Sequence, residues 1–176
     1  RPLLFRTRSS FRDGGTASAT SLLRCQMWEV ELLGTGARRT IVGLSLLGAA
    51  DSIYMLSYHL GLIGSLVCPF FGEGCNRVGR SSHARHFGVP NAAVGAAGYG
   101  AMAVLAAMSG RQEGRRWSAP LLAATSLSAF GASVFLTWEQ PFRVGAWCFW
   151  CLSSAAINLA ILPLALRGAA RKGDRL

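Results

Sequence analysis

Two close cysteine pairs are the residues in this sequence best suited to chemistry. Cys68 and Cys75 flank the loop CPFFGEGC, Cys148 and Cys151 form a C-x-x-C sequence, and Cys25 is left over. The C-x-x-C spacing places two sulfurs on adjoining parts of one helical turn, close enough to bond. The positive end of the helix dipole favours the thiolate of Cys148. A disulfide across so short a loop constrains few chain conformations, so the pattern predicts redox chemistry rather than a passive staple.

The loop pair is less informative when it is considered alone. Gly72 and Gly74 give the segment between Cys68 and Cys75 freedom to move, and a structural disulfide explains the spacing slightly better than a redox role. A second dithiol on the same face changes this balance, because thiolate attack can pass a disulfide from one pair to the other. We therefore predict an electron relay between a mobile loop pair and a fixed C-x-x-C pair.

Zinc binding is the main rival interpretation of these cysteines. Cys68, Cys75, His83 and His86 together offer four ligands, as does the C-x-x-C with one of the histidines. The spacings fit neither a zinc ribbon nor a zinc finger. We therefore predict no metal site.

Four apolar segments must position the cysteines. The chain is 51% hydrophobic and 15% charged, whereas a soluble domain carries roughly a quarter charged residues. A helix needs about 20 residues to cross the hydrocarbon core, and backbone groups in lipid must bond internally. The sequence predicts an all-α membrane protein, a four-transmembrane-helix bundle within residues 38–176. The expected helices cover residues 40–62, 89–109, 117–138 and 144–166.

Proline and polar residues suggest where two of these helices begin and end. Pro90 suits the first turn of the second helix. The third helix is expected to stop at Glu139, Gln140 and Pro141.

The basic residues predict an orientation rather than a nucleic-acid site. The net charge is +10, but the arginines flank apolar runs instead of clustering on one polar face. Nine basic residues lie beside one set of helix ends and four beside the other, before the N-terminal segment is counted. The positive-inside rule then places both termini in the cytoplasm or its equivalent. Residues 63–88 and 139–143, and with them both cysteine pairs, face an oxidising compartment.

The N-terminal stretch, residues 1–37, is basic and rich in serine. We expect little order before Arg38 and treat these residues as an N-terminal extension. Two alternatives stay open. One is a transit peptide, and the other is that Met27 is the natural start and the first 26 residues are not native.

Other polar and aromatic residues have two interpretations each. Asp51 near the middle of the first helix is either a carboxyl packed between helices or part of a proton relay, and we assign it no role. Trp147, Phe149 and Trp150 either line the pocket of a flat apolar ligand or belong to an interfacial aromatic belt.

The combined pattern resembles the vitamin K epoxide reductase family, which includes bacterial and plastid homologues that support disulfide formation. The resemblance covers about residues 38–170. It rests on two loop cysteines, a serine six residues past the second, four helices and a C-x-x-C on the last. The segments that carry it are DSIYMLSYH at 51–59, CNRVGRSS at 75–82, FGVPNAAVGAAGYG at 87–100 and CFWCLSSAAIN at 148–158.

The resemblance implies an order among the cysteines. Cys148 and Cys151 match the membrane redox pair, with Cys151 nearest a quinone. Cys68 and Cys75 match the shuttle pair, in which Cys75 exchanges with Cys148 and Cys68 meets the external partner.

The resemblance also implies a quinone cofactor, of the menaquinone, ubiquinone or phylloquinone type. Asn91 matches an asparagine that can hydrogen-bond a quinone carbonyl, and Ser81 falls on a short half-helix that covers the quinone pocket. We add Trp147 to the expected cofactor-binding residues. Ala155 replaces the tyrosine that binds the other quinone oxygen in the animal enzyme. That departure puts epoxide reduction in doubt and leaves quinone reduction open.

The function implied is a membrane enzyme, a quinone-dependent thiol oxidoreductase that supports disulfide bond formation. Its expected partner is a separate periplasmic or lumenal thioredoxin-like (DsbA-like) dithiol protein, because no fused thioredoxin domain is expected after the fourth helix. We expect a bacterial inner membrane, with a plastid thylakoid membrane as the alternative. Two other functions stay open, a vitamin K quinone or epoxide reductase and a non-enzymatic membrane scaffold stapled by disulfides.

Overall fold

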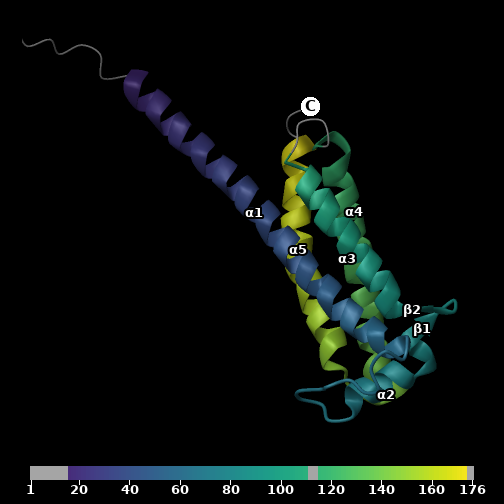
Figure 1. Ribbon diagram of the computed structural model, residues 1–176. Coiled ribbons are helices and arrows are strands. Elements are labelled where there is room, and N and C mark those ends of the chain that lie inside the picture. Colours follow the sequence, from purple (N-terminus) through teal and green to yellow (C-terminus); the bar gives the residue numbers. More distant parts are fainter. Residues whose placement is uncertain (1–15, 111–114, 174–176) are drawn as a thin grey trace, which may run out of the picture. The chain divides into compact units, whose positions relative to one another are not determined.

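The computed structural model describes the backbone of residues 16–110 and 115–173, and the side chains of residues 35–110 and 117–170 (Figure 1). The chain separates into two units, Arg1–Thr35 and Gly36–Leu176. The first long helix, α1 (Thr16–His59), begins within the first unit. The description of residues 1–37 as an N-terminal extension stays a prediction, and the backbone is helical from Thr16. Residues 1–15 lie outside the described residues.

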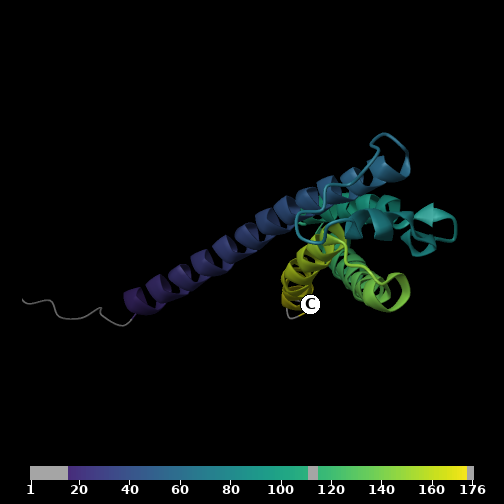
Figure 2. The ribbon, with the colours of Figure 1, turned by 90° about the horizontal axis from the view of Figure 1, so that it is seen from below.

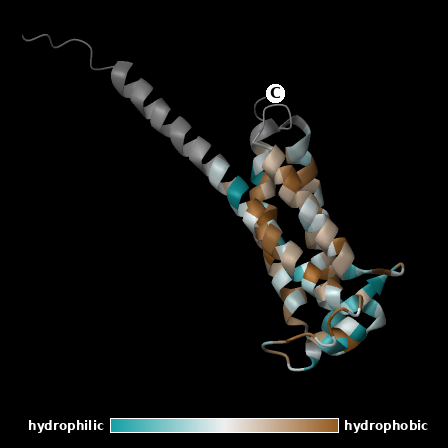
Figure 3. Cartoon of the chain, viewed as in Figure 1, coloured by the Kyte–Doolittle hydropathy of each residue, from teal (hydrophilic) through white to brown (hydrophobic). Residues whose placement is uncertain are grey.

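Four long apolar helices dominate the described residues, as the sequence predicted. They are α1, α3 (Asn91–Met108), α4 (Arg115–Glu139) and α5 (Phe149–Gly173). Each contains a segment long and apolar enough to cross a membrane, and Figure 3 shows apolar residues along all four. The candidate spans are Thr35–His59, Asn91–Met108, Trp117–Val144 and Phe149–Ala170. The protein is therefore a multi-pass membrane protein.

The helices pack into a bundle around a small apolar core. α4 packs against both α3 and α5, as can be followed in Figures 1 and 2. Buried residues from all four helices meet in this core, and a side chain at Gly48 of α1 would collide with the ring of Tyr99 on α3. The close approach of α1 and α3 therefore depends on a glycine, as expected where helices meet in lipid. The main buried core residues are Ile41, Tyr99, Met102, Leu122 and Ile161.

Short elements cover the end of the bundle opposite the described end of α5 (Figure 1). They are α2 (Gly74–Arg80), the 3₁₀ turn η1 (Ser82–Ala84), β1 (Arg85–His86) and β2 (Val89–Pro90). The two strands form an antiparallel hairpin in which His86 pairs with Val89. Phe87 and Gly88 make its turn, with φ angles of 54° and 80°.

Two predicted helix starts were wrong at this end. Residues 89–90 form strand β2 rather than the start of a helix, and α3 begins one residue after Pro90. The α-helix α4 ends at Glu139, as the sequence predicted, and a π-helical segment, η2 (Gln140–Val144), continues the third span to Val144. Pro141 lies in the first turn of η2, where its missing N–H is tolerated. Gly145, with φ of 67°, ends the segment, so α5 begins at Phe149 rather than near residue 144.

Candidate functional site

The two cysteine pairs meet at the covered end of the bundle. Cys75 in α2 and Cys148 before α5 are both fully buried, with no exposed surface, in the same apolar cluster. Cys68 and Cys151 pack against this cluster. The fold therefore brings together two pairs that are separated by more than seventy residues in the sequence.

The two pairs are in different redox states. Cys68 and Cys75 form a disulfide, with their Cα atoms 5.7 Å apart. Cys148 and Cys151 are free thiols. A disulfide next to a reduced dithiol is the arrangement that thiol–disulfide exchange requires.

Long-range hydrogen bonds fix the segment that leads to Cys68. Asn76 accepts a bond of 2.8 Å from the Leu66 N–H through Oδ1 and donates one of 3.3 Å to the Leu66 carbonyl through Nδ2. The hydroxyl oxygen of Tyr54 accepts a bond from the Val67 N–H at 3.0 Å. The indole N–H of Trp150 donates to the Val67 carbonyl at 2.7 Å. Trp150 lies inside the C-x-x-C, so a residue of the membrane pair holds the backbone beside Cys68.

Gln140 and the start of α5 hold Cys148. The Cys148 N–H donates to the side-chain Oε1 of Gln140 at 2.7 Å, and the Cys148 carbonyl accepts the first helical bond, from Leu152 N–H at 3.1 Å. A side-chain hydrogen bond from Cys151 is the largest cause of a lowered pKa at Cys148, and backbone hydrogen bonds from Cys151 and Trp150 act in the same direction, against the effect of burial. These hydrogen bonds favour the thiolate form of Cys148.

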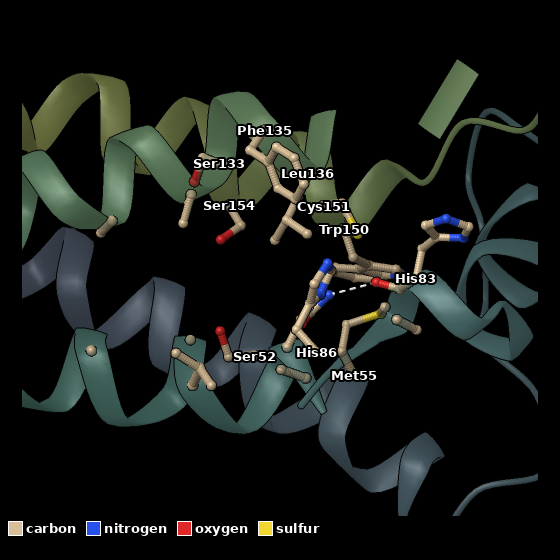
Figure 4. Close-up of a pocket in the computed structure, with 18 of the residues that line it drawn as sticks. Ser52, Met55, His83, His86, Ser133, Phe135, Leu136, Trp150, Cys151 and Ser154 are labelled. Atoms are coloured by element: carbon tan, nitrogen blue, oxygen red, sulfur yellow. Dashed lines mark hydrogen bonds between the residues drawn. The ribbon is translucent and has the colours of Figure 1, made fainter. Parts of the chain in front are cut away.

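A cavity of about 760 Å³ opens beside Cys151. Figure 4 shows Trp150, Cys151 and Ser154 of α5 on one side of it, facing Ser52 and Met55 of α1. Apolar side chains of α3 and α4 complete much of the wall. Its volume lies within the usual range for a small-molecule site.

Three of the predicted site residues line this cavity. They are Cys151, Asn91 at the first position of α3, and Ser81 at the end of α2. Ser81 donates its hydroxyl hydrogen to the Val78 carbonyl at 2.7 Å, which closes the last turn of α2.

Trp147 is not among the residues that line the cavity, contrary to our expectation. Its side chain is exposed, and its backbone carbonyl packs against Gly74. The reason is the late start of α5. Helical spacing carries residues 150, 151, 154 and 158 to the cavity wall, but Trp147 precedes the first turn of the helix. Ala155, at the position of the family's tyrosine, also lies outside the cavity lining.

A chain of polar contacts closes the outer part of the cavity. Asn91 Nδ2 donates to the His83 carbonyl at 2.8 Å. Asn91 Oδ1 lies 2.9 Å from His86 Nδ1, and His86 Nε2 lies 3.6 Å from Glu139 Oε2. His83, His86, Asn91 and Glu139 all line the cavity.

The cavity suits a quinone in size and in the character of its wall. Most of the wall area is apolar, and polar groups from several elements interrupt it. Asn91 uses one of its two amide hydrogens on His83 and retains the second. The residues that would hold a quinone are thus an amide donor at one end and an apolar wall next to the Cys151 sulfur.

No metal site was found in the part of the chain with described side chains. Within those residues, no group of three or more His, Cys, Asp and Glu side chains is placed to hold a metal ion. His86 instead contacts Asn91 and Glu139.

Sequence reasoning missed three contributors to the site. Gln140 was interpreted only as part of a helix stop, and His86 only as a loop residue or zinc ligand. Trp150 was considered for the cavity wall but not for its bond to the loop. The available signal was weak in each case, because these are contacts between residues distant in the sequence.

The fold and the site together define a class, the membrane proteins that carry out thiol–disulfide exchange beside an apolar cavity. Comparison with known proteins makes this specific. Residues 39–166 match the Vitamin K epoxide reductase family, and the chain belongs to that family. Family members are quinone-linked thiol oxidoreductases, so the protein is an enzyme of this type. A search of curated protein sequences found no match.

Proposed function

We propose that the protein oxidises a thioredoxin-like dithiol partner through Cys68 and Cys75 and passes the electrons through Cys148 and Cys151 to a quinone. Disulfide formation in the partner is the product. The charge bias along the sequence supports an outward-facing cysteine end. Ala155 and the pattern of the first helix, which depart from the animal enzyme, favour a bacterial inner membrane.

One observation carries this proposal. Cys148 is buried in one apolar cluster with Cys75, whereas Cys151 lines the cavity. This arrangement supports the order Cys75 to Cys148 to Cys151 for the electrons. A passive staple needs no such order and no cavity beside a free thiol.

The proposed exchange balances in two steps. A thiolate of the partner attacks Cys68, the Cys68–Cys75 bond breaks, and the second partner thiol completes the partner's disulfide. The Cys75 thiolate then attacks Cys148 within an oxidised Cys148–Cys151 pair, and Cys68 displaces Cys148. This sequence restores the Cys68–Cys75 disulfide and leaves Cys148 and Cys151 reduced, which is the pairing present in the structure.

The protein's own residues prepare the second pair for oxidation. A quinone bound in the cavity would accept the two electrons and two protons of the pair. As the two electrons and two protons of the pair pass to such a quinone, the Cys148–Cys151 bond would form, and the lowered pKa of Cys148 favours its thiolate as the sulfur that closes this bond. Gln140 holds the Cys148 backbone during this exchange. Asn91 would hold a carbonyl of the quinone through its remaining amide hydrogen.

Trapping the mixed disulfide tests the proposal. In the double variant Cys68→Ala and Cys151→Ala, the remaining Cys75 and Cys148 should form a disulfide that mass spectrometry detects. The matched control, Cys68→Ala with Cys148→Ala, leaves Cys75 and Cys151 and should give little of it. Equal trapping in the two variants would argue against the assigned order.

A further inference from the structure

The contacts of Asn91 fix the orientation of its amide group. The atom 2.8 Å from the His83 carbonyl oxygen must be the nitrogen, because two oxygens would repel each other. The amide oxygen therefore faces His86 Nδ1 at 2.9 Å. An amide oxygen only accepts hydrogen bonds, so Nδ1 of His86 must carry a hydrogen.

With a hydrogen on Nδ1, Nε2 of His86 faces Glu139 either with a lone pair or with a second hydrogen. In a neutral imidazole with its hydrogen on Nδ1, Nε2 has a lone pair. That lone pair would face Glu139 Oε2 at 3.6 Å. Oε2 is buried and has no hydrogen-bond partner among the described residues. Two facing acceptors would leave the buried Oε2 without a partner, and a hydrogen held between Nε2 and Oε2 would supply one.

We infer that His86 and Glu139 form a proton-holding pair that positions Asn91 to donate a hydrogen bond to a quinone oxygen. This inference rests on the proposed function. The shared proton resides on His86 Nε2 or on Glu139 Oε2. Either location leaves the Nδ1 hydrogen in place for Asn91. His86 and Glu139 are thus positioning residues, and Asn91 is the group that contacts the ligand.

Loss of the shared proton should disturb Asn91. The buried carboxylate would then draw the remaining imidazole hydrogen to Nε2. The lone pair on Nδ1 would face the Asn91 oxygen, and reversing the amide would set its oxygen against the His83 carbonyl. Neither orientation of Asn91 is satisfied, so the affinity for quinone should fall as the pH rises.

Other titratable groups surround the His86–Glu139 pair, and their contributions to the pH dependence of binding must be distinguished from that of the pair. Arg85 precedes His86 in β1, and the side chain of Phe135 on α4 stacks edge-on against the His86 ring. The other titratable residues that line the cavity are Asp51 and His59 of α1, His83 of η1, Tyr99 of α3 and Cys151 of α5. All of these stay unchanged in Glu139→Gln. The difference between the pH profiles of that variant and the wild type therefore isolates the pair.

The proposal is tested by the equilibrium binding of a short-chain benzoquinone to the full-length protein. Binding is measured between about pH 5 and about pH 9. Wild-type affinity should fall roughly fivefold to tenfold toward high pH, the effect of one lost hydrogen bond. Glu139→Gln should remain tight throughout, because an amide nitrogen can donate to His86 Nε2 at every pH. His86→Leu should be weak throughout. A matched control, Glu73→Gln, makes the same change at a carboxyl outside the cavity lining and should keep the wild-type profile.

A measurement without quinone examines the same pair independently. ¹⁵N NMR of the histidine-labelled protein, with His86→Gln used for assignment, should find a hydrogen on His86 Nδ1 at the pH where wild-type affinity is high. A bare Nδ1 there would overturn the proposal, as would a Glu139→Gln profile identical to the wild type. If Asn91→Ala weakens binding while Glu139→Gln changes nothing, the proton-holding pair alone is wrong. If the wild type binds no quinone, the proposed function fails instead.

Discussion

The two cysteine pairs occupy contrasting surroundings at the same end of the bundle. Cys148 and Cys151 are joined by a single helical turn, so local geometry alone sets their separation. Cys75 lies in the short helix α2, whereas Cys68 follows a segment whose backbone is bonded to the side chains of Tyr54, Asn76 and Trp150. The first pair depends on one helix, whereas the second depends also on a few hydrogen bonds. A relay needs both, because the inner pair must keep its place beside the cavity while the outer pair must reach a partner.

The largest expected effect comes from breaking the inner pair. Cys148→Ala or Cys151→Ala should reduce quinone reduction to the background rate with any reductant, because neither remaining thiol can complete a disulfide within the pair. The assay is the absorbance change of the quinone. Cys25→Ala, which belongs to neither pair, is the control and should keep full activity. Full turnover in either inner-pair variant would refute the relay.

Breaking the Cys68–Cys75 pair should change the turnover rate with a protein reductant but not the rate with a small thiol. Cys68→Ala should abolish oxidation of a thioredoxin-like partner, because the partner then has no disulfide to attack. Turnover with dithiothreitol, a small thiol that reaches the inner pair directly, should survive. The two rates are measured on the same preparation. Equal loss with both reductants would mean that Cys68 does more than shuttle electrons.

The thiolate of Cys148 provides a pH-dependent test of the inner pair. Its pKa lies below the ordinary thiol value mainly because Cys151 donates a hydrogen bond, so the thiolate persists at lower pH than in a free cysteine. Removing that donor with Cys151→Ala should move the titration to higher pH. Ultraviolet absorbance of the thiolate, followed in a Cys25→Ala background, measures the shift. A titration that moves to lower pH would contradict the assigned cause.

The smallest expected effect concerns the hydrogen bond that joins the two pairs. Trp150→Phe keeps an aromatic ring against Tyr54 but loses the donor to the Val67 carbonyl. One such bond contributes about 1 kcal/mol, so partner oxidation should fall roughly fivefold while turnover with dithiothreitol changes little. Trp147→Phe is the matched control, since Trp147 is exposed and outside the cavity lining. A larger effect from Trp147→Phe would reverse the roles assigned to the two tryptophans.

Sequence patterns anticipated the features that arise locally. Apolar runs of spanning length predicted four membrane helices, and the C-x-x-C at the start of the last helix follows directly from residue spacing. The cavity residues Asn91 and Ser81 were predicted through the family resemblance rather than from spacing.

The details that were missed depend on contacts between distant segments. No local signal states that η2 continues past Pro141, and this extra turn is what delays α5 and removes Trp147 from the cavity wall. The same turn brings Gln140 to the Cys148 backbone. The contact between His86 and Glu139 joins a hairpin to the end of a helix more than fifty residues away, which no periodicity encodes.

The central claim is tested most directly by the redox state of the four paired cysteines in living cells. This state is compared between cells with and without membrane quinone. Thiol alkylation followed by mass measurement counts the free thiols. If the protein passes electrons to a quinone, then Cys68, Cys75, Cys148 and Cys151 should accumulate as thiols in quinone-depleted cells and return to disulfides when quinone is restored. Cysteines that stay oxidised without quinone would contradict the relay and would indicate a disulfide-stapled scaffold.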